Sequence, residues 1–269
     1  KNSALSVEKF LRTIISTEKY PLTQLGNTNA TEMAKVLENS YRAMNIAFMV
    51  EWSRFAELAD VNLFEVVSAI RKRPTHSNMM LPGIGVGGYC LTKDPLLASW
   101  AKQNLFNSEL PLKQSEKSVK INDQMPLFAF NYLKETFKGS LRSKNVLLLG
   151  VSYRSDISDT RYTPVEPFYD YLNSEGAKIY LHDPYVEVWE EKGMEVSSDL
   201  DQLLKEDIDI LVFCTNHSEY INNESLIQSI SIKKNKNNFI FDTVGVLNEN
   251  EINILKESHT VKVVGRGDL

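Results

Sequence analysis

The sequence predicts an α/β protein in which a helical part precedes a doubly wound parallel sheet. Residues 27–61 form one long helical pattern, because their apolar residues recur at three-, four- and seven-residue spacings. From residue 145 onward, short apolar runs alternate with helical patterns, as in parallel strands joined by helices. The apolar run 146–149 ends in Gly150 and is typical of a buried parallel strand. The expected domains are a lead-in over residues 1–26, a helical domain over 27–142 and a Rossmann-like sheet over 143–269.

The composition is that of a globular protein, with 42% hydrophobic and 24% charged residues among 269. A net charge of −5 and a pI near 5.5 exclude the basic footprint of a protein that binds nucleic acid or anionic membranes. We find no apolar run long enough to span a bilayer and no signal-peptide pattern. Two cysteines cannot form a disulfide framework, so we expect a cytoplasmic protein. Because the chain begins at Lys1, we expect the natural start to be missing.

The long helical pattern has one apolar face. Lys35 and Asn39 lie outside this face and, four residues apart, project from the helix one above the other. The residues alone favour a solvated polar face for this pair, although asparagine forms helices poorly and hints at another role. The apolar face is larger than the chain can cover, which favours a homodimer. Its residues are Met33, Leu37, Met44, Phe48, Phe55 and Leu58.

Further helical patterns fill the rest of the first half. A helix over residues 63–72 ends before Pro74, and its basic end is either solvated or an anion contact. Residues 95–103 look helical, which would place Cys90 at the mouth of that helix. Residues 113–137 form another long pattern, in which a proline marks a kink or a break.

In the second half, ligands are expected beyond the carboxyl ends of the strands. Gly150 follows a strand but has no complete dinucleotide fingerprint, so a sheet that binds a nucleotide without being the main dinucleotide domain fits best. The expected strands are residues 146–150, 178–181, 208–214, 239–242 and 261–265, and the expected helices are 164–174, 200–204 and 223–230. The strand ends carry Arg154, Asp159, Arg161, Asp183, Thr215, His217 and Arg266.

The chemically most informative stretch is residues 82–95, PGIGVGGYCLTKDP. It holds four of the 12 glycines within six residues, and glycines permit tight turns and close approach of a ligand. Cys90, followed by Lys93 and Asp94, has the surroundings of a usable nucleophile; the alternative is an ordinary surface turn. The spacing also matches G-x-G-x-x-G, but no strand–turn–helix unit surrounds it, and this context argues against a dinucleotide site.

Two other residues have simpler interpretations. Cys214 lies inside an apolar strand and is most simply a buried small hydrophobic residue. His217 is either a ligand-binding residue or a loop histidine satisfied by its neighbours. No pair of His or Cys residues has metal-ligand spacing, so the sequence predicts no metal site.

Three motifs, in the same order, resemble those of the nucleotide-sugar 6-dehydrogenases, the family of UDP-glucose and UDP-N-acetylhexosamine dehydrogenases. They resemble the family's catalytic-lysine helix, its active-site loop and the opening of its C-terminal nucleotide-sugar domain. The resemblance runs from about residue 27 to the end. The matching segments are residues 32–39 (EMAKVLEN), 85–95 (GVGGYCLTKDP), 149–154 (LGVSYR) with 159–164 (DTRYTP), 182–184 (HDP) and Gly265-Arg266.

The resemblance implies an NAD-binding Rossmann domain, a helical middle domain and a second Rossmann-like domain that binds UDP. This chain would hold the last two, with residues 1–26 as a remnant of the junction, and would be inactive without the NAD domain. The implied reaction is NAD-dependent oxidation of the 6-hydroxymethyl group of a UDP-hexose to a carboxylate, for polysaccharide-precursor synthesis. It would proceed through a cysteine thiohemiacetal and thioester. The implied partners are a UDP-sugar and a second copy bound through the long helix, with no nucleic acid and no membrane.

Carried over by motif, the resemblance also implies residue roles. Cys90 would attack the intermediate aldehyde, and Lys35 would stabilise the developing oxyanion. Asn39 would hold a water or a substrate oxygen, while Asp94 would position or activate water. The glycines would let the sugar approach. The implied substrate-binding residues are Gly85, Gly87, Gly88, Tyr89, Arg73, Arg154 and Arg161. The implied cofactor-binding residues are Lys93, Arg161 and Arg266, and no metal is implied.

The chain departs from the family pattern at two places. Arg154 stands where the family usually has lysine, which keeps the charge but changes its geometry. In residues 74–81, where a sugar-contacting arginine that reaches a neighbouring subunit would be expected, the chain has His76, with Arg73 nearby. The choice between UDP-glucose and an N-acetylated UDP-sugar is therefore open. The alternative to a dehydrogenase is a UDP-sugar-binding or dimerising module without turnover.

Overall fold

The computed structural model describes residues 2–232 and 237–269. The chain forms two compact units, Lys1–Glu38 and Asn39–Leu269, whose boundary lies within one long helix, and each unit is described by itself. The sequence predicts this long helix over nearly the same residues. The helices at this end of the chain are α1 (Asn2–Leu11) and α2 (Thr28–Leu58).

The buried face of α2 consists mostly of small and polar residues, with Met49 and Val50, and not of the predicted apolar face. Asn39 is fully buried, so the solvated-face interpretation of this residue is wrong. Small side chains allow neighbouring helices to come close, and Asn122 of a following helix donates from Nδ2 to the Ala43 carbonyl at 3.0 Å. The buried residues of α2 are Asn39, Ser40, Ala43, Ala47, Met49, Val50, Ser53 and Ala56.

The second unit continues with four further α-helices and a single 3-10 turn before the sheet. Helix α4 begins at Tyr89, before the expected start at residue 95, so Cys90 lies within its first turn. Pro95 lies inside α4, where it removes one helical hydrogen bond. The pattern at 113–137 is broken into two helices at Gln124. The elements are α3 (Leu63–Arg71), η1 (Pro74–His76), α4 (Tyr89–Asn104), α5 (Lys113–Asp123) and α6 (Met125–Thr136).

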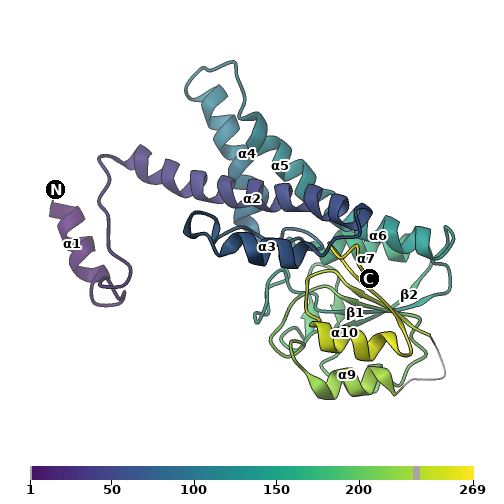
Figure 1. Cartoon of the computed structure of the whole chain (residues 1–269). Helices are drawn as coiled ribbons and strands as arrows, with labels where there is room; N and C mark the ends of the chain where they lie inside the picture. The colour runs from purple at the N-terminus through teal and green to yellow at the C-terminus, as the bar shows by residue number, and fades with distance from the viewer. Residues whose placement is uncertain (1, 233–236) are drawn as a thin grey trace. The chain divides into compact units, whose positions relative to one another are not determined.

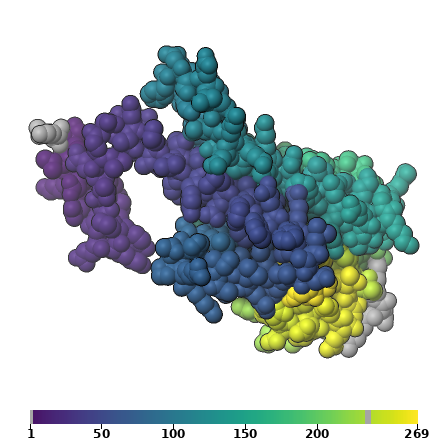
Figure 2. Space-filling model, turned by 45° about the horizontal axis from the view of Figure 1, so that its top comes forward, coloured from purple at the N-terminus to yellow at the C-terminus, as the bar shows by residue number. Residues whose placement is uncertain are grey.

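Helices α4 and α5 form a hairpin that stands out from the rest of the second unit (Figures 1 and 2). Their contact is fixed by Ser99, whose hydroxyl accepts the backbone N–H of Leu112 at 2.9 Å and donates to Glu116 at 2.5 Å. Across the residues that the structure describes, no helix is both long and apolar enough to cross a membrane.

The sheet has five parallel strands in the order β2-β1-β5-β6-β7, and all five are predicted from the sequence. The chain also forms a short antiparallel pair, β3 with β4, and a helix α10, which the sequence analysis does not predict. The strands are β1 (Asn145–Leu149), β2 (Lys178–His182), β3 (Val188–Trp189), β4 (Met194–Glu195), β5 (Ile210–Phe213), β6 (Phe239–Asp242) and β7 (Thr260–Val263). The helices among them are α7 (Val165–Ser174), α8 (Leu200–Leu203), α9 (Glu224–Ser231) and α10 (Glu249–Lys256).

Side chains alternate between the two faces of the sheet, and helices cover both faces (Figure 1). On one face, Val146 and Leu148 of β1 pack with residues of α6 and α7. On the other face, Leu147 and Leu149 pack with residues of α9 and α10. Helix α6 precedes β1 in the chain, so the last helix of the predicted helical domain contributes to the core of the sheet.

A substitution of Gly150 can measure how tightly the turn after β1 is packed. Its φ is +94°, and a Cβ added there would overlap the Thr215 side chain. We predict that Gly150→Ala lowers the free energy of unfolding by about 3–5 kcal/mol, because backbone strain and steric overlap add together. Gly139 has a φ of +86° but open space around a Cβ, so Gly139→Ala should cost only about 1–2 kcal/mol. Urea unfolding measures both losses, and equal losses would contradict the close packing of Thr215.

Candidate active site

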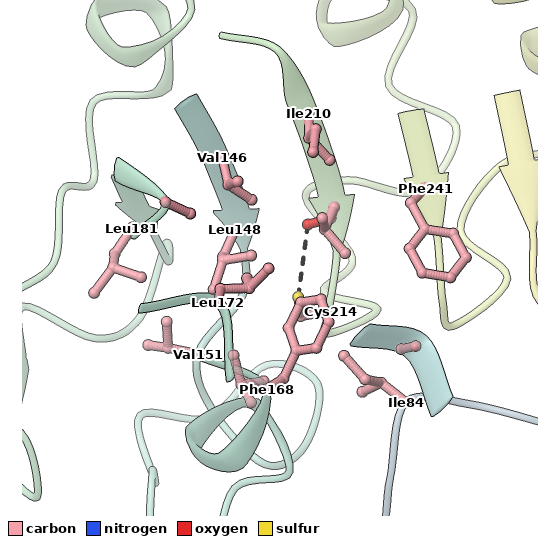
Figure 3. Close-up of a cluster of buried hydrophobic side chains, with 14 of the residues drawn as sticks. Ile84, Val146, Leu148, Val151, Phe168, Leu172, Leu181, Ile210, Cys214 and Phe241 are labelled. Carbon is pink, nitrogen blue, oxygen red and sulfur yellow. Dashed lines mark hydrogen bonds between the residues drawn. The ribbon is translucent and has the colours of Figure 1, made fainter. Parts of the chain in front are cut away.

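The glycine-rich loop is anchored in the hydrophobic core of the sheet. Ile84 is only 2% exposed and belongs to the same cluster as Phe168 and Phe241. Figure 3 shows the Ile84 side chain directed toward these core residues. Beside it, a Cβ on Gly85 would overlap Pro164. Burying an isoleucine contributes about 2–3 kcal/mol, so the loop is held in place by the protein itself.

Two further glycines of the loop lie directly against residues 153–164. A Cβ on Gly87 would come within 2.5 Å of the Tyr153 Cβ and 2.8 Å of the Tyr162 carbonyl oxygen. A Cβ on Gly88 would come within 2.7 Å of the Tyr153 ring. These glycines are therefore required for close approach of two segments of the chain, a reason other than the predicted approach of a sugar. The contact joins two motifs that are far apart in the sequence.

The first turn of α4 places Tyr89 and Cys90 at the end of this loop. Cys90 is exposed and its thiol is free. The N-cap residue, Gly88, has no side chain with which to satisfy the backbone N–H groups of the first turn. Such N–H groups stabilise negative charge, which suits a reaction at the thiol. The Tyr89 ring packs against Tyr162, with their centroids 5.6 Å apart.

Three of the predicted site residues meet one turn further along α4. Asn39 donates from Nδ2 to Asp94 Oδ2 at 2.7 Å, and Lys93 donates from Nζ to Asp94 Oδ1 at 2.8 Å. Asp94 is buried, and its hydrogen bond raises the pKa of Lys93. The Lys93 Nζ also lies 4.6 Å from the centroid of the Tyr89 ring. The structure thus explains why an asparagine occupies the interior of α2.

Lys35 belongs to the first unit and is described with that unit alone. It lies on α2, where its Nζ is 3.6 Å from Glu38 Oε2. Both side chains are exposed, and an ion pair of this kind contributes little to stability. The catalytic role of Lys35 stays a prediction from its motif.

Two predicted arginines lie on the segment that contacts the glycine loop. Arg161 donates to both carboxylate oxygens of Asp159, at 2.9 and 2.6 Å. This pairing raises the pKa of Arg161 and lowers the pKa of Asp159. Arg154 has an exposed side chain, and its carbonyl accepts the Ser152 hydroxyl at 2.9 Å. The fold therefore brings two cationic side chains to the same loop that packs against the glycines.

The other two predicted arginines have different surroundings. Arg73 lines a recess of about 460 Å³ together with Ile70, His76 and Met79. Arg266 is buried and donates to the chain's own carboxylates, those of Glu249 at 2.6 Å and Asp268 at 2.7 Å. Its roles in binding a cofactor, like the substrate role of Arg73, stay predictions.

A second polar cluster, centred on Asp183, orders the turn after β1. Asp183 Oδ2 accepts the backbone N–H groups of Val151 and Ser152 at 2.8 and 3.1 Å, and the Nε2–H of His217 at 3.1 Å. Nδ1 of His217 accepts the N–H of Asp156 at 2.9 Å, which assigns the ring proton to Nε2. Burial alone would raise the pKa of Asp183, but the hydrogen bonds outweigh it and lower the pKa. Of the two interpretations of His217, the satisfied loop histidine is confirmed.

The sequence analysis missed the aromatic side of the site. Tyr153 and Tyr162 both contact the glycine loop, and Tyr162 has a φ of +54°, which is unusual for tyrosine. A single sequence does not reveal such a backbone conformation. Asn122 is also missed, although an amide within an apolar helical pattern is a detectable signal of a buried contact.

Cys214 is buried in the sheet, as predicted. Its Sγ lies 3.7 Å from the Val212 carbonyl oxygen, a contact drawn in Figure 3. Burial raises the pKa of its thiol. Within residues 2–232 and 237–269, no group of three or more His, Cys, Asp and Glu side chains is arranged to hold a metal ion.

Two family models match the chain, and between them they include the glycine loop and the segment that contacts it. The central domain of the UDP-glucose/GDP-mannose dehydrogenase family matches residues 29–124. The UDP-binding domain of the same family matches residues 147–249. The two matches follow each other in the order that the motifs predict.

Individual relatives and solved structures agree with these matches. A UDP-N-acetyl-D-mannosamine dehydrogenase of Methanocaldococcus jannaschii is 31% identical over 99% of this chain and 58% of that relative. A structure of UDP-D-ManNAc dehydrogenase from Pyrococcus horikoshii has a TM-score of 0.79 at 27% identity, covering 100% of this chain and 59% of that one. An NDP-N-acetyl-D-galactosaminuronic acid dehydrogenase from Methanosarcina mazei has a TM-score of 0.77 at 26% identity, covering 89% and 51%. The chain thus spans little more than half the length of these proteins.

The two cysteines should differ in reactivity. We predict that iodoacetamide labels Cys90 in the folded protein and reaches Cys214 roughly 100-fold more slowly or only after unfolding, because Cys214 is buried and the pKa of its thiol is raised. Intact-mass spectrometry with peptide mapping measures the labelling. Cys90→Ser should abolish labelling of the folded protein, and rapid labelling of Cys214 would contradict its burial.

Proposed function

The chain belongs to the UDP-glucose/GDP-mannose dehydrogenase family, and on that premise we propose that it is the substrate-binding and covalent-chemistry part of a UDP-sugar 6-dehydrogenase. The observation that carries this proposal is the contact between the glycine loop and residues 153–164. Because of that contact, the segments that carry the Cys90 thiol, Arg154 and Arg161 are packed together. The nucleotide diphosphate would bind at the arginines, and C6 of the sugar would lie at Cys90.

In the proposed reaction, a 6-hydroxymethyl group loses two hydride equivalents and gains one water to become a carboxylate. After the first oxidation, the Cys90 thiolate adds to the aldehyde carbon, which forms a C–S bond and moves an electron pair onto the oxygen. Loss of the second hydride from this thiohemiacetal gives a thioester. Water then breaks the C–S bond and releases the carboxylate and the thiol. The exposed thiol in the first turn of α4 suits this sequence of steps.

Three polar residues would assist Cys90. We propose that Asp94 positions the attacking water and that Asn39 holds both Asp94 and a water or substrate oxygen, as their 2.7 Å hydrogen bond supports. Lys35 would stabilise the oxyanion, and this role rests on the motif alone.

At the proposed nucleotide-binding part of the site, the side chains of Arg154 and Arg161 differ in how available they are to a diphosphate. An arginine can present two parallel N–H groups to a phosphate, which makes either side chain suitable. Arg161 already forms two hydrogen bonds with Asp159, so a diphosphate must compete with that carboxylate. Arg154 has an exposed side chain and is the stronger candidate.

The family's hydride acceptor, NAD, does not fit the sheet of this chain. The turn after β1 lacks the dinucleotide fingerprint, the Thr215 side chain packs on Gly150, and the N–H groups of Val151 and Ser152 point at Asp183. We therefore propose that NAD binds elsewhere in the whole protein. Of the predicted cofactor contacts, Lys93 and Arg266 are already engaged with carboxylates.

We propose an N-acetylated UDP-hexosamine as the substrate, with UDP-N-acetyl-D-mannosamine as the first to test. The support is that the relatives that match most of the chain carry this name. A uronic acid linked to UDP is a suitable precursor for a polysaccharide, and we place its synthesis in the cytoplasm.

We also propose that the chain forms a homodimer through α2. Within the second unit, α2 exposes a stripe of apolar side chains that are 37% to 85% accessible. Phe48, Trp52 and Phe55 form a continuous aromatic ridge in this stripe, with neighbouring centroids 5.9 Å apart. Aromatic side chains are enriched in protein interfaces. The stripe consists of Tyr41, Met44, Phe48, Trp52, Phe55 and Leu58.

The proposed activity can be tested with the protein from the whole reading frame. We predict that it reduces NAD⁺ in the presence of UDP-N-acetyl-D-mannosamine, and that Cys90→Ala lowers the rate by on the order of 10³-fold or more, because no thioester can form. Cys214→Ala is the matched control and should retain turnover. NADH absorbance measures the rate, with UDP-glucose as the competing substrate.

The present chain, residues 1–269, provides the complementary measurement. It should bind UDP in calorimetry and reduce no NAD⁺, and Arg154→Ala should weaken binding by roughly 10- to 100-fold. UDP binding without any NAD⁺ reduction by the whole protein would favour the binding-module alternative. Absence of UDP binding would contradict both functions.

If the chain dimerises through α2, charged residues introduced on the exposed face of α2 should weaken the dimer. Phe48→Glu combined with Phe55→Glu should raise the dimer dissociation constant by at least about 100-fold, because two aromatic contacts are replaced by buried charges. Ile254→Glu is the matched control, since Ile254 is similarly exposed on α10. Sedimentation velocity measures the mass, and an unaltered chain that remains monomeric at high concentration would exclude the dimer.

A further inference from the structure

The turn that follows β1 lies at the topological switch point of the sheet. In the order β2-β1-β5-β6-β7, the strands extend outward from β1 in one direction and from β5 in the other. In sheets of this kind, a ligand binds in the crevice at that point, and the backbone N–H groups of the turn hold its phosphates. The groups that these N–H donors contact therefore decide whether the sheet can accept a dinucleotide.

In this chain the donors point at an internal anion. Asp183 directly follows β2, and its Oδ2 lies 2.8 Å from the Val151 nitrogen and 3.1 Å from the Ser152 nitrogen. His217, from the segment after β5, donates its Nε2–H to the same oxygen at 3.1 Å. Oδ2 of the fully buried Asp183 thus accepts hydrogen bonds from the segments that follow β1 and β5, the two strands of the switch point.

A local turn does not explain these contacts. The other oxygen of Asp183, Oδ1, accepts the N–H groups of Tyr185 and Val186 at 2.9 and 3.2 Å, which is the usual turn formed by an aspartate with the residues after it. The Oδ2 bonds instead span 31 to 34 residues. They connect separate strand ends and satisfy donors that would otherwise be free for a ligand.

The crevice beside this carboxylate is also filled. A Cβ on Gly150 would overlap the Thr215 side chain, so the turn and the residues after β5 are in close contact there. The Thr215 hydroxyl also donates to the Ser152 carbonyl at 2.8 Å, which ties the segment after β5 to the turn.

We propose that the Asp183 carboxylate replaces a ligand phosphate in the turn formed by residues 150–152 and thereby closes the switch point of this sheet to dinucleotides. A tethered carboxylate is present at a high effective concentration, so a phosphate from solution cannot displace it. A nucleotide diphosphate that binds this domain must then be held by side chains outside the turn. This inference rests on the geometry of the turn and not on which UDP-sugar the protein takes.

Removal of the carboxylate should convert the turn into an anion site. We expect Asp183→Ala to lower the midpoint of thermal unfolding by on the order of 10 °C, because the N–H donors lose their acceptor. Inorganic phosphate should restore at least half of this loss with a saturable concentration dependence, and should leave the unaltered chain unchanged beyond a sodium chloride control of equal ionic strength.

Asp183→Leu is the matched control. It removes the same hydrogen bonds but fills the space, so phosphate should not restore its midpoint. If phosphate raised the unfolding midpoint equally in both variants and in the unaltered chain, the recovery would be a general salt effect. That result would overturn the proposal. Recovery with formate but not with phosphate would also overturn it, because the turn would then be too small for a phosphate.

If Asp183→Ala does not fold, the unaltered chain still tests the inference. The backbone amide signals of Val151 and Ser152 in ¹⁵N-resolved NMR should not move when phosphate or NAD⁺ is added. Saturable movement of both signals on addition of NAD⁺ would show an open switch point and overturn the proposal.

Discussion

The contact between the glycine loop and residues 153–164 is the constraint on which the candidate site depends. Ile84 fixes the loop in the sheet core, and the glycines that follow it allow the backbone to lie against Tyr153 and Pro164. A catalytic thiol is effective only when it is held at a defined distance from the groups that bind the rest of the substrate. In this protein, packing of the loop against residues 153–164 fixes the position of the segment that leads to Cys90.

The division of α2 into two faces follows from the same need for close packing. Its inner face uses small residues, so that Asn39 and Ala43 can come within hydrogen-bonding distance of α4 and α5. The large apolar residues lie on the outer face, where they are exposed within the described part of the second unit. A buried amide in a helix interior is stable here because Asp94 accepts its N–H.

Much of the sheet can be predicted from the sequence, because buried parallel strands appear as short apolar runs between turn residues. The same reasoning identifies Cys214 as buried and the break between α5 and α6. It fails for the inner face of α2, because apolar spacing shows where large side chains lie but not which neighbour covers them. It fails for the start of α4, because a proline is expected at the first helical position, whereas Pro95 lies inside a helix that begins at Tyr89.

The candidate site, like the fold, is predicted only in part from the sequence. Cys90 and Asp94 are singled out by residue type and spacing, whereas Asn39 is implicated only by the resemblance of its motif, because the residues alone favour a solvated face. The contacts of Tyr153 and Tyr162 with the glycines, and of Asp183 with His217, arise from strand order and backbone conformation, which a single sequence does not display. Because Asp183 uses the backbone donors of the turn, positive charge for a diphosphate has to come from side chains. In the proposed function, arginines at the surface would provide that charge without any change in the turn, so a Rossmann-like sheet without a dinucleotide site could still bind a nucleotide.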